Sequence, residues 1–313
     1  MEKERKWKMR VTIFTPTYNR RKQLKRLYMS LCEQTFQDFE WLIVDDGSED
    51  NTGEDVEKWI DEKKINIRYH YQENNGKHIA MNWAVNNARG NYFITMDSDD
   101  VFRVDGVEKL VKIWKSIPDE NKKLFSTVKA RCFDPTTGNS VGKDVPQEHH
   151  VCSYLDAKYK YKFDSEMVSM TRIEVLKEFP NPDIRGGAQH GGLRFYPEGI
   201  WQDLAARKYK TFFINDLLCG YTQDNSESLL GRGKKYNRYR ENIYLWPHVV
   251  NDNLDYFRYD PKSFIKAFIG ISMDGFFLKM NIRNMLKLVN GFWRKGVTLC
   301  FVPIGYFCYI KRR

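Results

Sequence analysis

The chain has 313 residues, of which 42% are hydrophobic and 29% charged, and it carries a formal net charge of +10. This length exceeds that of a typical single domain, so we expect one large core with an appendage. The six cysteines lack C-x-x-C spacing, which argues against a zinc site and a disulfide framework. The first residues lack the apolar stretch of a secretory signal, so we expect a cytoplasmic protein.

Short apolar runs alternate with helical patterns over the first hundred residues. Residues 11–15 and 40–44 are predicted as buried strands, and each run ends in a polar cluster. Between the strands, apolar residues recur at helical spacing: Leu24, Leu27, Tyr28 and Leu31, then Val56, Trp59 and Ile60, then Ile79, Met81, Trp83 and Val85. This alternation predicts an open parallel sheet, in which ligands bind at the carboxyl ends of the strands.

An acidic cluster follows the fourth predicted strand. In residues 91–102, NYFITMDSDDVF, an apolar run ends in Asp97, Asp99 and Asp100. If the strand stays extended, Asp97 and Asp99 point to the same side. Two carboxylates on one side form half of a site for Mg²⁺ or Mn²⁺, with water and substrate phosphates as the remaining ligands. A solvated acidic turn before a helix starting near Val104 would explain the tetrapeptide equally well.

The middle of the chain contains a predicted strand at 124–133 and a glycine-rich stretch around Gln189 and His190. A helix is expected to follow, with Glu198 at its beginning. Its packing face is predicted to consist of Trp201, Leu204 and Ala205.

The C-terminal region is strongly basic. Residues 231–313 contain 16 Lys and Arg against 5 Asp and Glu, so they hold the whole positive excess. Two apolar runs, 264–280 and 297–310, lie in this region, and the second is too short to span a bilayer and contains Pro303. We expect an interfacial segment, from about Phe264 onward, that docks on an anionic membrane surface. A buried helix pair packed on the rest of the chain is the alternative, and no nucleic-acid-binding motif accompanies the positive charge.

Three segments together carry a family resemblance: TPTYNR (15–20), QTFQDFEWLIVDDGSEDNT (34–52) and the segment 74–100, which ends in MDSDD. In this order and spacing they resemble the nucleotide-sugar-binding half of family 2 glycosyltransferases. The resemblance implies an α/β GT-A fold with a C-terminal helical appendage. The catalytic domain would be 1–230, with a donor half to about 103 and an acceptor half after it, and 231–313 would form the appendage.

The resemblance also implies roles for single residues. The uracil of a UDP-sugar would contact Tyr18 and Asp46, and Asp97 would reach the ribose or a metal. Asp99 would bind the metal that bridges the diphosphate, or Asp100 would if the strand ends early. The remaining donor-binding residues would be Pro16, Asn19, Arg20 and Lys77. From the residues alone, Asp46 could instead belong to a turn, and Asn19 could cap the following helix.

The implied activity is inverting transfer of a sugar from a UDP-sugar to a hydroxyl of a growing, lipid-linked glycan, with Mn²⁺ or Mg²⁺ as Lewis acid. Such a reaction needs a base for the acceptor hydroxyl. Glu198 is the first candidate and Asp203 the second, although Glu198 could also be a first-turn carboxylate stabilised by the helix dipole. The enzyme would lie on the inner face of the cell membrane.

Two other functions stay open at this stage. A catalytically inactive sugar-nucleotide-binding protein would keep the fold and lose the base. A nucleotidyltransferase usually has a glycine-rich segment after the first strand, where this chain reads PTYNRRKQ.

Overall fold

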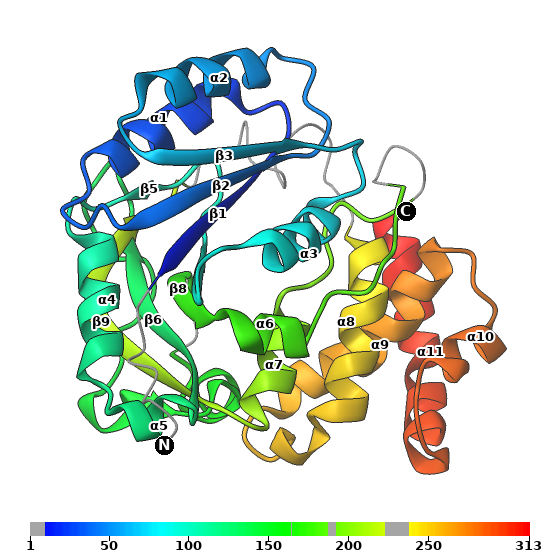
Figure 1. Ribbon diagram of the computed structural model, residues 1–313. Coiled ribbons are helices and arrows are strands. Elements are labelled where there is room, and N and C mark those ends of the chain that lie inside the picture. Colours follow the sequence, from blue (N-terminus) through cyan, green and yellow to red (C-terminus); the bar gives the residue numbers. More distant parts are fainter. Residues whose placement is uncertain (1–9, 164, 187–191, 223–237) are drawn as a thin grey trace, which may run out of the picture.

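The computed structural model describes residues 10–163, 165–186, 192–222 and 238–313. A central mixed sheet has helices on both faces, and the C-terminal helices stand together beside it (Figure 1). The strands are β1 Val11–Thr17, β2 Phe39–Asp45, β3 Asn66–Tyr71, β4 Tyr92–Thr95, β5 Val101–Phe102, β6 Phe125–Phe133, β7 Val151–Cys152, β8 Met167–Arg172 and β9 Lys210–Gly220. Their order is β3-β2-β1-β4-β8-β6-β9-β5, and β7 pairs with β9.

The first four strands of this order are parallel, as the sequence predicted. The second half of the sheet, for which the sequence made no prediction of strand direction, is mixed, because β8 runs antiparallel to both β4 and β6. Strands β5 and β7 also pair antiparallel with β9.

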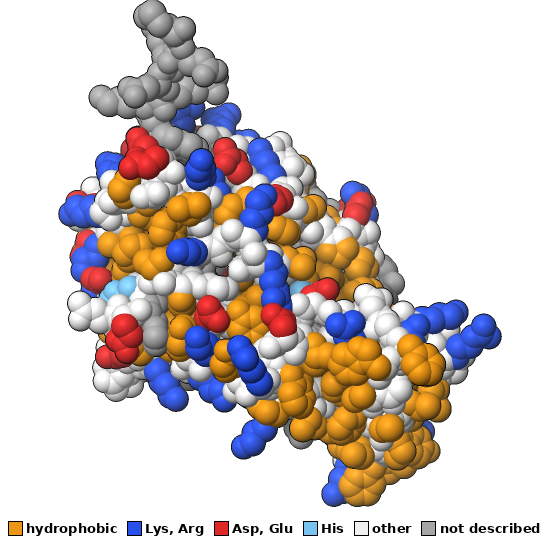
Figure 2. Space-filling model, turned by 90° about the horizontal axis from the view of Figure 1, so that it is seen from below, with side chains coloured by type: hydrophobic (Ala, Val, Ile, Leu, Met, Phe, Trp, Pro, Cys, Tyr) orange, Lys and Arg blue, Asp and Glu red, His pale blue; other side chains and the backbone are white. Residues whose placement is uncertain are grey.

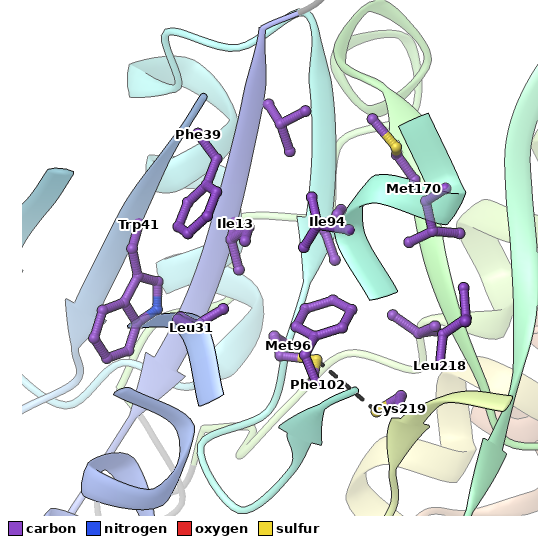
Figure 3. Packing of buried hydrophobic residues seen from close by; sticks show 14 of the residues in the cluster. Ile13, Leu31, Phe39, Trp41, Ile94, Met96, Phe102, Met170, Leu218 and Cys219 are labelled. Carbon is purple, nitrogen blue, oxygen red and sulfur yellow. Dashed lines mark hydrogen bonds between the residues drawn. The ribbon is translucent and has the colours of Figure 1, made fainter. Parts of the chain in front are cut away.

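Alternating side chains of the parallel strands build two separate cores. Ile13, Trp41 and Ile94 face α1, α2 and α4, and Figure 3 shows them packed in one layer. Phe14 and Phe93, one residue away in each strand, face α3, α6 and α7. The helices concerned are α1 Arg21–Cys32, α2 Thr52–Glu62, α3 Lys77–Asn87, α4 Gly106–Ser116, α6 Ile173–Glu178 and α7 Gly199–Ala206, and a short α5 spans Asp119–Lys122.

A third core joins the C-terminal helices to the sheet domain. These helices are α8 Tyr239–Asp252, α9 Pro261–Phe277, α10 Ile282–Lys287 and α11 Phe292–Arg312. Phe264 and Phe268 of α9 are buried with Tyr154 and Phe213 of the sheet domain. The expectation of a membrane-docking segment from Phe264 onward is therefore wrong for α9, which is part of the core. The boundary predicted at residue 231 lies outside the described residues.

Helix α11 is continuous through Pro303. It packs on α9 through Thr298, Val302 and Gly305, where an added Cβ at Gly305 would clash with the Ser272 side chain. Among the described residues, no helix is long and apolar enough to cross a bilayer.

Candidate active site

The polar clusters predicted after β1, β2 and β4 lie at one edge of the sheet, and hydrogen bonds join them. The loops after β1 and β2 are joined through Asn19, whose backbone N–H donates to Ser48 Oγ (2.9 Å). Its side-chain oxygen accepts from the Glu49 N–H (2.8 Å). Asn19 thus connects two loops instead of capping α1, whose N-cap is Arg20.

Asp46 fastens the turn that leads into α3. Its carboxylate accepts hydrogen bonds from Gln72 Nε2 (2.7 Å) and from the N–H groups of Asn75 (2.9 Å) and Gly76 (2.8 Å). Burial raises the pKa of Asp46, and these three hydrogen bonds oppose the rise. The sequence did not reveal Gln72 or Asn75 as partners, because they follow a different strand from Asp46.

The acidic segment after β4 is a turn and not an extended strand. Strand β4 ends at Thr95, and the Asp100 N–H donates to the Asp97 carbonyl (3.1 Å). The prediction that Asp97 and Asp99 share one side by strand alternation is therefore wrong. Each carboxylate has its own cation: Lys77 Nζ lies 2.7 Å from Asp97, and Arg20 Nη1 lies 2.7 Å from Asp99.

Asp100 points inward, where its carboxylate accepts from the Thr222 N–H (3.2 Å). Burial, with the charges of Asp97 and Asp99 second, raises the pKa of Asp100 well above its usual value. This carboxylate is already engaged by a backbone hydrogen bond, whereas the side chains of Asp97 and Asp99 are partly exposed. Asp97 and Asp99 are the better candidates.

Lys77 connects the acidic turn to the second half of the chain. Its ammonium lies 2.7 Å from Asp97 Oδ1 and 2.9 Å from Glu198 Oε1. Burial disfavours the charged form, but the two carboxylates outweigh burial and raise the pKa of Lys77 above its usual value. Lys77 is therefore a fixed positive charge between the predicted donor-binding residues and the predicted base.

The two predicted bases lie in different environments. Glu198 directly precedes α7, and its side chain is 36% exposed. Asp203 is fully buried and accepts hydrogen bonds from Lys158 Nζ (2.9 Å) and Asn253 Nδ2 (2.8 Å). The structure places Asp203 against α8, away from the cavity beside Glu198. Leu204, predicted to pack inward, is exposed, and Asp203 takes the inner position.

A cavity of about 590 Å³ lies beside Glu198 and the acidic turn. Its wall combines charged, hydroxyl and aromatic side chains, which include Lys77, Asp97, Glu198, Thr171, Trp201 and Gln202. Pockets of this size and mixed lining are typical of small-molecule sites. A ligand here would contact the cation, the turn and the candidate base together.

The chemistry of the turn fits a hard divalent cation only in part. Asp97 and Asp99 supply oxygen ligands and are both partly exposed. Within the described residues, no group of three His, Cys, Asp or Glu side chains could hold a metal alone. The remaining ligands would have to come from a bound phosphate group and water.

Comparison with known proteins gives two kinds of match. Residues 12–136 match the family described as glycosyl transferase family 2. The chain is 36% identical over 225 residues to the putative teichuronic acid biosynthesis glycosyltransferase TuaG of Bacillus subtilis, which covers 70% of this chain and 81% of TuaG. Other relatives are longer, and the chain spans 15% and 18% of the length of two of them.

Two solved structures share the fold. Staphylococcus aureus TarS 1–349 in complex with UDP-GlcNAc matches with a TM-score of 0.60 at 19% identity, over 90% of this chain and 82% of that one. The mannosyltransferase PcManGT from Pyrobaculum calidifontis, in complex with GDP-Man and Mn²⁺, matches with a TM-score of 0.51 at 18% identity, over 96% and 81%. At these identities the likeness concerns the fold alone.

Proposed function

This chain belongs to glycosyl transferase family 2 and is a glycosyltransferase with the GT-A fold, and on that basis we propose that it transfers a sugar from a UDP-sugar to a glycan hydroxyl with inversion. The observation that carries the proposal is the position of Lys77 between Asp97 and Glu198 at the rim of one cavity. The carboxyl edge of the parallel strands and the start of α7 meet there, so the predicted donor-binding residues and base can act on one bond.

The uridine part of the donor is assigned to the loops after β1 and β2. Tyr18 and Asp46 are the proposed uracil contacts, with Pro16, Asn19 and Arg20 beside them. The structure of TarS with UDP-GlcNAc supports a UDP-sugar as donor class. The Asn19 and Ser48 hydrogen bond gives these loops a defined mutual position before any donor binds.

We assign the divalent cation to the acidic turn. Asp99 and Asp97 would hold Mn²⁺ or Mg²⁺ together with the donor diphosphate, and PcManGT with Mn²⁺ supports this assignment. When bound, the cation would neutralise negative charge on the departing UDP. Arg20 and Lys77, which contact the same carboxylates, would turn toward the diphosphate oxygens.

Glu198 is the proposed general base. Its carboxylate takes the proton of the acceptor hydroxyl while that oxygen forms a bond to the anomeric carbon and the bond from carbon to UDP breaks. Attack from the face opposite the leaving group inverts the configuration. Asp203 keeps a structural role, because its oxygens are occupied by Lys158 and Asn253.

We assign the acceptor to a surface polysaccharide under construction, carried on a lipid. TuaG, the relative with the teichuronic acid name, supports a polysaccharide product. A lipid-linked acceptor requires the enzyme to work near a membrane, and helix α11 offers a surface for this.

The outer face of α11 is apolar and solvent-facing. Phe292, Leu299, Phe307 and Ile310 recur on this face, and each is 50% exposed or more. Figure 2 shows hydrophobic side chains gathered at this end of the molecule, with Lys and Arg at the margin. Residues 281–313 contain seven Lys and Arg and no Asp or Glu, so the segment complements anionic headgroups. We therefore propose peripheral docking of α11 on the inner face of the cell membrane.

Release of UDP tests the proposed function. The purified protein is incubated with a panel of UDP-sugars and Mn²⁺, and free UDP is measured with and without lipid extract as acceptor source. We expect one UDP-sugar to give UDP release that Glu198→Gln abolishes. Binding of UDP without any turnover would favour the inactive sugar-nucleotide-binding alternative.

A further inference from the structure

Lys77 is a counter-ion shared between the two halves of the site. Its ammonium contacts Asp97 at 2.7 Å and Glu198 at 2.9 Å, and the side chain is 16% exposed. These carboxylates come from segments about a hundred residues apart. A single cation therefore balances a proposed donor-side ligand and the proposed base.

Two hydrogen bonds hold the backbone at Lys77 and at the residue before it. Its N–H donates to the Arg194 carbonyl (2.8 Å), and the preceding Gly76 N–H donates to Asp46 (2.8 Å). Gly76 has φ +97, and a Cβ there would clash with the Leu193 carbonyl. Lys77 can therefore change partners only by turning its side chain.

The local charge makes such a change favourable when a diphosphate arrives. Asp97 and Glu198 carry two negative charges against the one positive charge of Lys77. A diphosphate brings further negative charge to the same edge, and charge-assisted hydrogen bonds to phosphate oxygens are strong. A cation bound at Asp97 would also repel the ammonium from that carboxylate.

We propose that Lys77 is a positioning residue that holds Glu198 in the donor-free enzyme and passes to the donor diphosphate when the donor binds. The inference rests on the proposed function, since it takes Glu198 as the base. It implies that donor binding regulates the proposed base, because Glu198 becomes available to an acceptor hydroxyl only in the donor-loaded enzyme. The exchange involves hydrogen bonds and ion pairs only, so no covalent bond is made or broken in it.

This handover has an unusual consequence for binding. In the free protein, Glu198 competes with UDP for the Lys77 ammonium. Glu198→Gln should therefore tighten UDP binding several-fold, although Glu198 lies on the acceptor side. The gain should disappear when Lys77 is replaced, because the competition needs both side chains.

The experiment measures the Kd of UDP with Mn²⁺ by calorimetry for wild type, Glu198→Gln, Lys77→Gln and the double variant. We expect Glu198→Gln to lower the Kd several-fold in the wild-type background and to leave it unchanged in Lys77→Gln. In a Lys77→Arg background, Glu198→Gln should still lower the Kd in part, since arginine keeps the positive charge. Glu166→Gln is the matched control, because Glu166 lines the same cavity, whereas the ion pairs of Lys77 with described residues are those with Asp97 and Glu198.

An unchanged Kd in Glu198→Gln, or an equal gain in both backgrounds or with Glu166→Gln, overturns the handover. A wild-type protein that binds none of UDP, GDP and dTDP contradicts the proposed function instead. Thermal melting of each variant confirms folding, and Lys77→Met, which also lacks the charge, replaces Lys77→Gln if that variant does not fold.

Discussion

Arg20 and Asp99 form an ion pair of 2.7 Å that joins the loop after β1 to the turn after β4. Arg20 is almost completely buried and Asp99 is partly exposed, so Asp99 is the member of the pair that a bound donor can reach. The pair holds a proposed metal ligand in place before any metal or donor arrives.

We predict that Asp99→Asn lowers sugar transfer by at least about 10²-fold, the loss typical when one electrostatic stabiliser is removed. The amide oxygen can still accept from Arg20, so the thermal midpoint should change little. Turnover and melting are measured on the same preparation.

Asp144→Asn is the control for this change. Asp144 also pairs with a buried arginine, Arg131, but it does not line the cavity. Equal loss of activity in both variants would indicate a general effect of charge removal and not a role in the site.

The two acidic residues of the 198–203 segment should separate into catalysis and stability. Glu198→Gln is expected to lower kcat by about 10²- to 10⁴-fold with an unchanged free energy of unfolding. Asp203→Ala should cost about 3–5 kcal/mol of stability, because Lys158 would lose its buried partner. Denaturant unfolding and turnover measure the two effects. An Asp203→Ala variant that unfolds like wild type but has no activity would contradict this division.

Helix α11 should determine membrane binding. The double change Leu299→Gln and Phe307→Gln removes apolar area from the outer face without touching the buried Val302. We expect it to abolish sedimentation with phosphatidylglycerol vesicles and to leave UDP binding unchanged. Added salt should release wild type only in part, because screening weakens the charge attraction and not the apolar contact.

Met29→Gln is the matched control, since Met29 of α1 is as exposed as Leu299 and Phe307 and lies outside the C-terminal helices. Concentration-dependent self-association of wild type, lost in the α11 variant while vesicles have no effect, would assign this face to a second copy of the chain.

Low pH should lower the free energy of unfolding through His78, which lies at the start of α3. The ring Nε2 of His78 hydrogen-bonds to the Ile184 carbonyl (2.8 Å), and Nδ1 is buried without a hydrogen-bond partner among the residues that the structure describes. Burial lowers the pKa of His78 from 6.5. In the unfolded chain His78 binds a proton near pH 6.5 and in the folded chain only at lower pH, so stability is complete above 6.5 and declines below it.

Urea unfolding at pH 7.5 and 5.5 tests this expectation. His78→Gln should reduce the decline, because the amide donates to Ile184 without titrating. His70→Gln is the comparison, since the pKa of His70 is also lowered by burial but its ring is more exposed. A decline equal in wild type and His78→Gln would contradict the assignment.

The local sequence pattern was sufficient to predict many of the strands and helices of the donor half. The strands predicted at 11–15 and 40–44 correspond to β1 and β2, and the helical spacing around Leu24 and Val56 corresponds to α1 and α2. Each pattern is set by which face of one element is buried, and that information is contained in a few neighbouring residues. Parallel pairing then brought the ends of β1, β2 and β4 together.

The geometry of the acidic turn could not be predicted from the local sequence pattern. Strand β4 ends at Thr95, and the hydrogen bond between Asp100 and Asp97 turns the chain. Side-chain direction beyond a strand end depends on that turn, which the apolar run before it does not encode.

The sequence by itself determined the family, the order of the donor-half elements and the segments that carry the candidate site, because hydrophobic periodicity and motif spacing are local properties. The tertiary structure alone decided which carboxylates face the cavity and which are structural. Asp203 and Asn253 are 50 residues apart, and Lys77 and Glu198 lie on different elements, so only packing brings each pair into contact. The same reason placed α9 inside a core and left the outer face of α11 in solvent: both segments are apolar and basic, and the available neighbours decide which becomes buried.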